Sequence, residues 1–127
     1  MKEPVWIRAE FVLVIHEEML AEFGGSAGIR DQGLLESALG KPKNLFSYGN
    51  PSLCDLAASY AVGIVKNHPF IDGNKRTGFM VAYTFLTRNG LEFVASESVA
   101  AAAVIALAAN ELTEAQFSDW LKDNCLS

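Results

Sequence analysis

The sequence predicts an all-α protein, a single compact domain of about six short helices around a central hydrophobic helix. Apolar residues recur at spacings of three and four nearly throughout, whereas alternation long enough for a strand is hard to find. Half of the 127 residues are hydrophobic, so the chain can bury one core but is too short for two. No internal repeat or low-complexity linker is found, and residues 1–127 are predicted to form one domain.

The first two helices are bounded by glycine and proline. The first is predicted over residues 8–23 and stops at Gly24-Gly25. The second is predicted to begin at Asp31, whose carboxylate suits an N-cap, and to end at Gly40 and Pro42. The inward residues of the first helix are predicted to be Phe11, Ile15 and Leu20.

Residues 41–50, KPKNLFSYGN, are predicted to form a loop because they are rich in turn-forming residues. The segment still carries the large apolar side chains of Leu45, Phe46 and Tyr48. Apolar groups in a loop either form a contact surface or tuck beneath the loop, and both interpretations stay open.

The third and fourth helices flank the most unusual stretch of the chain. The third is predicted to begin at Asn50-Pro51, with proline at the first helical position, and to stop before Pro69. The fourth is predicted to run from Gly73 to Asn89-Gly90 and to be the central element of the fold.

The fifth and sixth helices differ in polarity. Residues 97–110 are apolar on every side, so this helix is either wholly buried or faces a partner through an open groove. The sixth helix opens with a capping box formed by Thr113 and Gln116.

The charge balance limits the classes of partner. With a net charge of −5 and a pI near 4.9, the surface as a whole repels nucleic acid and anionic membranes. A polyanion would therefore need a local cationic pocket. The longest apolar run, residues 99–109, is too short to span a bilayer as a helix. The opening residues have an early acid and no long apolar core, so no secretory signal is predicted. Cys54 and Cys125 are therefore expected to be reduced thiols in a cytoplasmic protein.

Residues 68–79, HPFIDGNKRTGF, form a candidate anion site. One helix is predicted to end at His68 and the next to begin at Gly73, so the unpaired N–H groups of the new helix face the turn between them. Those donors and the helix dipole favour phosphate. Lys75 and Arg76 add two full positive charges to the same helical turn. The stretch therefore predicts a polyphosphate site.

His68 and Asp72 each have two possible roles. Asp72 is either an N-cap carboxylate bonded to the Lys75 N–H or, beside bound phosphate, a ligand for Mg²⁺. His68 is either a structural residue at a helix C-terminus or the base that takes a proton from an incoming hydroxyl. Together the residues indicate magnesium-dependent phosphoryl or nucleotidyl transfer, and the chain has neither a Walker A loop nor a kinase Gly-rich loop.

The stretch His68-Pro69-Phe70-x-Asp72-Gly73-Asn74 resembles the signature of Fic-fold enzymes, H-P-F-x-[DE]-G-N-G-R-x-x-R. Lys75 stands where that signature has glycine, and Phe79 stands where it has the second arginine. Both departures resemble the Doc ("death on curing") branch, whose motif ends in N-K-R-T. The segment GGSAGIRDQGLLESALGKPKNLFSYG and the helix end TRNG are similar to Doc chains as well, so the resemblance covers most of residues 11–92.

The resemblance implies a Fic fold and a phosphoryl or nucleotidyl transferase. Fic enzymes transfer a nucleotide monophosphate to a protein hydroxyl, whereas Doc toxins transfer the γ-phosphate of ATP to a threonine of elongation factor Tu and arrest translation. A lysine stem in place of glycine, and the loss of the second arginine, favour the reversed nucleotide orientation of Doc. The catalytic roles implied are His68 as general base, Lys75 as a catalytic cation and Asp72 as Mg²⁺ ligand. The phosphate-binding residues implied are Gly73, Asn74, Lys75 and Arg76. The resemblance also implies a flap, formed by Leu45, Phe46 and Tyr48, that docks the target backbone as an added strand.

The resemblance also implies a partner. Many Fic proteins carry an inhibitory [ST]-x-x-x-E-[GN] helix, and no glutamate of this sequence is followed by Gly or Asn. Doc toxins are restrained by a separate antitoxin of the Phd type. Such an antitoxin is expected here, bound partly by apolar surface near the fifth and sixth helices.

Other residues and classes carry weaker signals. Arg30-Asp31 is interpreted as a local ion pair or as a nucleotide contact, and His16 as a partly exposed bystander. Trp6 and Trp120 are interpreted as packing residues. A small helical DNA-binding regulator is disfavoured by the acidic charge, so no DNA binding by the chain itself is expected. A catalytically silent scaffold that retains the pocket is the remaining alternative.

Overall fold

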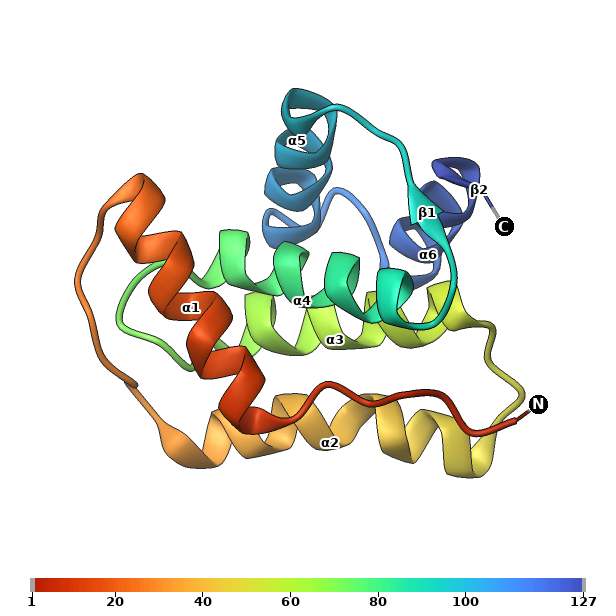
Figure 1. The fold of residues 1–127 in the computed structure, drawn as a ribbon, viewed down its shortest axis with the longest axis horizontal. Helices are drawn as coiled ribbons and strands as arrows, with labels where there is room; N and C mark the ends of the chain where they lie inside the picture. The colour runs from red at the N-terminus through yellow and green to blue at the C-terminus, as the bar shows by residue number, and fades with distance from the viewer. Residues whose placement is uncertain (1, 127) are drawn as a thin grey trace.

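The computed structural model describes residues 2–126 and confirms the all-α class (Figure 1). Six helices pack around one hydrophobic core, and two strands of two residues each pair antiparallel near the C-terminus. The elements are α1 (Ala9–Phe23), α2 (Gln32–Tyr48), α3 (Leu53–Asn67), α4 (Asn74–Arg88), β1 (Glu92–Phe93), α5 (Glu97–Ala108), α6 (Glu114–Asp123) and β2 (Cys125–Leu126).

The centre of the fold is α3. It lies between α2 and α4 and also contacts α5 and α6, and ten of its fifteen residues are buried (Figure 1). The prediction that the helix after Gly73 would be central was wrong. That helix, α4, keeps a solvent-facing side that carries Lys75 and Arg88, whereas the small residues of α3 let neighbouring helices approach it from several sides.

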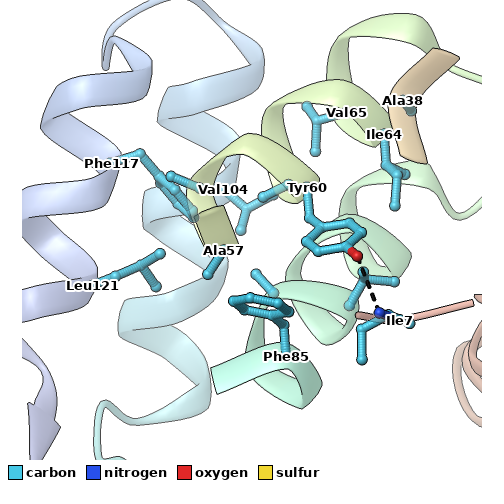
Figure 2. Close-up of a cluster of buried hydrophobic side chains, with 14 of the residues drawn as sticks. Ile7, Ala38, Ala57, Tyr60, Ile64, Val65, Phe85, Val104, Phe117 and Leu121 are labelled. Atoms are coloured by element: carbon cyan, nitrogen blue, oxygen red, sulfur yellow. Dashed lines mark hydrogen bonds between the residues drawn. The ribbon is translucent and has the colours of Figure 1, made fainter. Parts of the chain in front are cut away.

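A buried hydroxyl ties the N-terminal segment to this core. The side chain of Tyr60 on α3 is fully buried, and its hydroxyl oxygen accepts a 3.0 Å hydrogen bond from the Ile7 N–H (Figure 2). Phe85 of α4 packs beside the Tyr60 ring, with the two ring centroids 5.3 Å apart. The hydroxyl therefore satisfies a backbone donor that would otherwise be unpaired in the core.

Helix α2 differs most from its prediction, because it continues through Pro42 to Tyr48. Proline has no N–H for the carbonyl of Ala38, four residues earlier, but the helix is held by its packing on α3. A Cβ atom built on Gly63 of α3 would lie only 3.0 Å from the Ala38 Cα and 3.1 Å from its carbonyl oxygen. The two helices therefore cross with their backbones in close approach at Ala38 and Gly63.

The predicted loop over residues 41–50 is consequently wrong for most of its length. Leu45 and Phe46 lie on the last turns of α2, are half-buried and pack against the core, whereas Tyr48 is 90% exposed. Phe46 meets the Trp6 ring edge-on, with the centroids 5.6 Å apart. A helix presents no extended backbone edge for a strand to pair with, so the segment up to Tyr48 does not have the form expected of a flap.

Side-chain caps set the starts of α3 and α6. The prediction that Pro51 occupies the first helical position of α3 was wrong by two residues, because Ser52 is the N-cap and forms a reciprocal capping box with Asp55. The capping box of α6 is confirmed. The Thr113 hydroxyl oxygen accepts from the Gln116 N–H, and the Thr113 N–H donates to the Gln116 side chain.

Helix α5 is neither wholly buried nor wholly exposed. Ala100, Val104 and Leu107 face the core, while Val99 and Ile105 on the opposite side are 48% and 58% exposed. The predicted use of this apolar face by a partner stays a prediction.

The C-terminal strand and the two cysteines form a small contact that the sequence did not indicate. Phe93 of β1 pairs with Cys125 of β2. Both cysteines are free thiols, and Cys54 is buried. Burial, reinforced by the neighbouring Cys125, raises the pKa of Cys54 to about 12, so this thiol stays protonated at neutral pH. No helix within residues 2–126 is long and apolar enough to cross a bilayer.

Candidate functional site

The motif residues form the turn between α3 and α4. As predicted, α3 ends just before Pro69, and its C-cap, His68, takes a left-handed backbone conformation with φ 55°. Gly73 is the N-cap of α4 and is also left-handed, with φ 80°. The side chains of His68 and Asp72 are exposed at this turn. We call residues 68–76 the motif turn.

Phe70 and Asn74 fix the interior of the motif turn. Phe70 is fully buried and anchors the turn in the core. The Asn74 side chain is also buried, and its amide accepts a 2.9 Å bond from the Phe70 N–H and donates a 3.0 Å bond to the Phe70 carbonyl. Asn74 was predicted to bind phosphate, but its side chain is engaged in holding the turn, which leaves its backbone N–H for that role.

The connection between α1 and α2 lies along the motif turn, and we call residues 24–31 the linker. Figure 1 shows the linker and the turn between α3 and α4 at the same end of the molecule. Ile29 and Phe70 form an antiparallel β-bridge, and the Pro69 carbonyl accepts hydrogen bonds from the Arg30 and Asp31 N–H groups at 2.7 and 3.0 Å. The Ile71 N–H donates to the Gly28 carbonyl at 3.1 Å. The linker therefore fixes the backbone path of the motif.

Arg30 contacts the carbonyl groups at the end of α3. Its Nε donates to the His68 carbonyl at 2.7 Å and its Nη2 to the Asn67 carbonyl at 2.9 Å. The interpretation of Arg30 and Asp31 as an ion pair was wrong, because Asp31 caps α2 by accepting from the Leu34 N–H. A guanidinium at a helix C-terminus satisfies carbonyls that lack helical partners, and here it also orients the backbone of His68.

Replacing Arg30 by methionine is expected to lower kcat for the predicted transfer reaction at least about 10-fold, because small misplacements of a catalytic group are costly. Little change is expected in KM for ATP, the predicted substrate. Steady-state kinetics measure both values. Arg88→Met is the matched control, since the Arg88 guanidinium stacks on Phe11 at 4.5 Å, away from the motif turn. An Arg30→Met protein with the kcat of Arg88→Met would show that Arg30 does not position His68.

Two backbone N–H groups hold the Asp72 carboxylate. Its Oδ1 accepts from the Gly73 N–H at 2.9 Å and its Oδ2 from the Ser26 N–H at 3.2 Å. These bonds, first that from Ser26 and then that from Gly73, lower the pKa of Asp72 below its ordinary value, and the charge of Arg76 adds to them. Asp72 is thus an ionised, exposed and oriented carboxylate at neutral pH.

The structure differs from two predictions for Asp72 and Gly73. The predicted N-cap bond from Asp72 to the Lys75 N–H is absent among the hydrogen bonds of residues 2–126, and Gly73 is the N-cap instead. The Gly73 N–H was predicted to bind phosphate, but it donates to Asp72. The linker also lies very close to the Asp72 carboxylate, because a Cβ atom built on Gly25 would be 2.8 Å from Asp72 Oδ2. Glycine at position 25 is therefore a steric requirement of the site.

The cations of the motif turn are exposed. Neither Lys75 nor Arg76 forms an ion pair with any residue of the described chain, 2–126. The Arg76 guanidinium stacks on the Phe23 ring at 4.3 Å, at the end of α1. Two unpaired cations at a helix N-terminus oppose the helix dipole, so a bound anion would relieve an unfavourable arrangement.

The interpretation of His16 as a partly exposed bystander was wrong. His16 is 4% exposed, its Nε2 lies 2.8 Å from the Asp72 carbonyl oxygen, and its ring stacks on Phe70 with a centroid separation of 3.8 Å. A signal was available in the sequence. With Val12, Ile15 and Met19, His16 completes the buried stripe of α1 at three- and four-residue spacing, whereas Phe11 and Leu20, predicted as inward, are half-buried.

The donor set fits a magnesium ion held jointly with a nucleotide. No cluster of three or more His, Cys, Asp or Glu side chains able to hold a metal exists in residues 2–126. Mg²⁺ commonly takes one or two carboxylates and completes its shell with substrate phosphates and water. A single ionised carboxylate, Asp72, beside a helix N-terminus with Lys75 and Arg76 meets that description.

Comparison with known proteins agrees with this geometry. The sequence description of the Fic/DOC family matches residues 6–86, and the chain belongs to this family. Two Doc proteins resemble it. The chain is 41% identical over 80 residues to "Toxin Doc" of Mycolicibacterium smegmatis, across 61% of each chain, so the match covers less than two thirds of that protein. It is 31% identical over 117 residues to "Protein kinase doc" of Escherichia phage P1, across 91% of this chain and 92% of that one. The chain is therefore a Doc-type member of the family, as its motif indicated.

Proposed function

We propose that the protein is a Doc-type toxin that transfers the γ-phosphate of ATP to a serine or threonine hydroxyl of a target protein. The observation that carries the proposal is the motif turn, in which two exposed residues, His68 and Asp72, stand between the end of α3 and the start of α4. The relative named as a protein kinase aligns with nearly the whole chain. By resemblance, the target is a threonine of elongation factor Tu, whose modification would arrest translation.

The exposed side chains of His68, Asp72, Lys75 and Arg76 each have a role in this reaction. The His68 imidazole is exposed and free to take the proton of the attacking hydroxyl. Lys75, Arg76 and the N–H groups at the start of α4 bind the phosphates, and Lys75 stabilises charge on the transferred group. Asp72 would hold Mg²⁺, which when bound neutralises phosphate charge.

The position of Phe79 favours phosphoryl over nucleotidyl transfer. This residue replaces the second arginine of the Fic signature, and its ring is half-buried against Phe93 of β1, with the centroids 5.5 Å apart. No cation is therefore available at this position to clamp a distal phosphate in the Fic orientation. Nucleotidyl transfer to a protein hydroxyl remains the alternative that the experiment must separate.

A Phd-type antitoxin is the proposed partner. The apolar side of α5, with Val99 and Ile105 exposed, supplies a surface that a folding peptide segment could cover. Co-expression with a neighbouring small open reading frame tests this proposal. Relief of growth arrest and recovery of a complex are expected, and the failure of both would contradict it.

Lysate or purified elongation factor Tu, incubated with the protein, Mg²⁺ and ATP labelled in either the γ- or the α-phosphate, tests the reaction. Label is expected to pass to the target from γ-labelled ATP only, and the intact mass of the target should rise by one phosphate. Transfer from α-labelled ATP would instead establish nucleotidyl transfer. The Lys75→Gly variant, which restores the Fic residue, is expected to lose γ-transfer selectively. No transfer from either nucleotide would contradict the proposal.

A further inference from the structure

We propose that His16 is a positioning residue that fixes the Asp72 carboxylate in the orientation needed to hold Mg²⁺ with the nucleotide. The inference rests on the proposed function and adds a residue from α1, more than fifty positions before the motif turn. His16 would touch neither metal nor nucleotide. It would act through the Asp72–Gly73 peptide group.

The His16 ring is held in one place. It is 4% exposed, and it lies nearly parallel to the Phe70 ring, at an interplanar angle of 9° and a centroid distance of 3.8 Å. Its Nε2 is 2.8 Å from the Asp72 carbonyl oxygen. A carbonyl oxygen only accepts, so Nε2 carries the hydrogen of this bond.

The hydrogen bond acts on a peptide group that is also bound at its other end. The Asp72 carbonyl and the Gly73 N–H belong to the same planar peptide. The carbonyl accepts from His16 on one side, and the N–H donates to Asp72 Oδ1 on the other. Rotation of this peptide would break both bonds. The hydrogen bond from the imidazole therefore restrains the orientation of the carboxylate through this peptide.

Packing and a second donor complete the arrangement. Gly73, at φ 80°, lies close over α1, and a Cβ at this position would be 3.4 Å from Leu20 and 3.6 Å from His16 Nε2. The other carboxylate oxygen, Oδ2, accepts from the Ser26 N–H of the linker. With His16 removed, only the Ser26 bond and the peptide N–H would orient the carboxylate, and the peptide would be free to turn.

A core-filling histidine and a positioning histidine predict different results. If His16 only fills space, its apolar substitution should change stability and leave metal binding alone. If it positions Asp72, loss of the donor should weaken metal binding even where the fold is kept. Groups that orient a metal ligand typically contribute about 10- to 100-fold in metal affinity or activity.

The test uses the full-length protein and two complementary variants. His16→Phe keeps an aromatic ring to stack on Phe70 but has no donor, and His16→Gln keeps an N–H donor but loses the ring. The readouts are calorimetric titration of Mg²⁺ with a non-hydrolysable ATP analogue, and the Mg²⁺ concentration that gives half-maximal transfer. Circular dichroism checks the fold, and His16→Leu replaces His16→Phe if the latter is not folded.

For His16→Phe, about a tenfold loss of metal-dependent nucleotide binding is expected, with kcat largely recovered at saturating Mg²⁺. His16→Gln is expected to stay within about threefold of the wild type, because it can still donate. Wild-type affinity in a folded His16→Phe protein, or equal losses in both variants, would overturn the inference.

A wild-type protein that binds the metal and nucleotide but transfers no phosphate would contradict the proposed function alone. In that case the binding affinities of the two His16 variants would still test the positioning role of His16. Wild-type protein without metal-dependent binding would overturn both.

Discussion

Replacing His68, the proposed general base, by asparagine is expected to slow the proposed phosphoryl transfer about 10²- to 10⁴-fold while the protein stays folded, because this is the usual contribution of such a base. Asparagine cannot take the proton of the attacking hydroxyl, but it tolerates the left-handed conformation that His68 adopts. Its backbone carbonyl still accepts from Arg30, so the end of α3 is preserved. The rate is measured as initial transfer of the γ-phosphate at saturating ATP.

Two controls separate chemistry from structure in this experiment. Binding of a non-hydrolysable ATP analogue should change little in His68→Asn, because the groups proposed to bind phosphate lie on α4. His68→Ala removes the same imidazole but suits the left-handed backbone less well, so it should be slightly less stable at an equally low rate. If His68→Asn transfers phosphate at more than about a tenth of the wild-type rate, His68 is not the base.

Replacing Gly63 by alanine is expected to lower the free energy of unfolding by about 1–3 kcal/mol, as overpacking typically does. The new methyl group would lie 3.0–3.1 Å from the Cα, Cβ and carbonyl oxygen of Ala38. Two of these are backbone atoms of α2, so the clash is relieved only if the helices move apart. Urea denaturation followed by circular dichroism measures the change.

Gly40→Ala is the matched control on the same helix pair. Gly40 also lies inside α2, but no atom is within 4 Å of a Cβ at that position. Here alanine should raise stability by about 0.5–1 kcal/mol through its helix propensity. The same substitution is therefore expected to change the free energy of unfolding with opposite signs at the two sites. A stabilised Gly63→Ala protein would show that α2 and α3 can move apart at no cost in stability.

The sequence predicted those parts of the fold and site that depend on local signals. The six helices, the capping box at Thr113 and the stop before Pro69 follow from residues within one or two turns of each other. The motif turn was predicted for the same reason, since the end of α3 at His68 and the start of α4 at Gly73 are only five positions apart. Within it, however, the bonds of Asn74 and of the Gly73 N–H depend on side-chain directions that spacing does not specify.

Features that depend on tertiary contacts were missed or misjudged. Pro42 was expected to end α2, but packing on α3 outweighs the lost hydrogen bond. Arg30 and His16 contact residues 38 and 56 positions away. The stripe of α1 indicates that His16 is buried, but no local pattern reveals the partner of either side chain. The central position of α3 depends in the same way on how many helices pack against it.

The linker has a consequence for how the activity depends on folding. Hydrogen bonds from the Arg30 side chain of the linker and from His16 of α1 hold the His68 and Asp72 regions, and these partners are 38 and 56 positions apart along the chain. No short excised peptide containing the motif can reproduce this geometry. The proposed activity should therefore be lost cooperatively with the native state under denaturing conditions, so that loss of transfer would report unfolding of the whole chain.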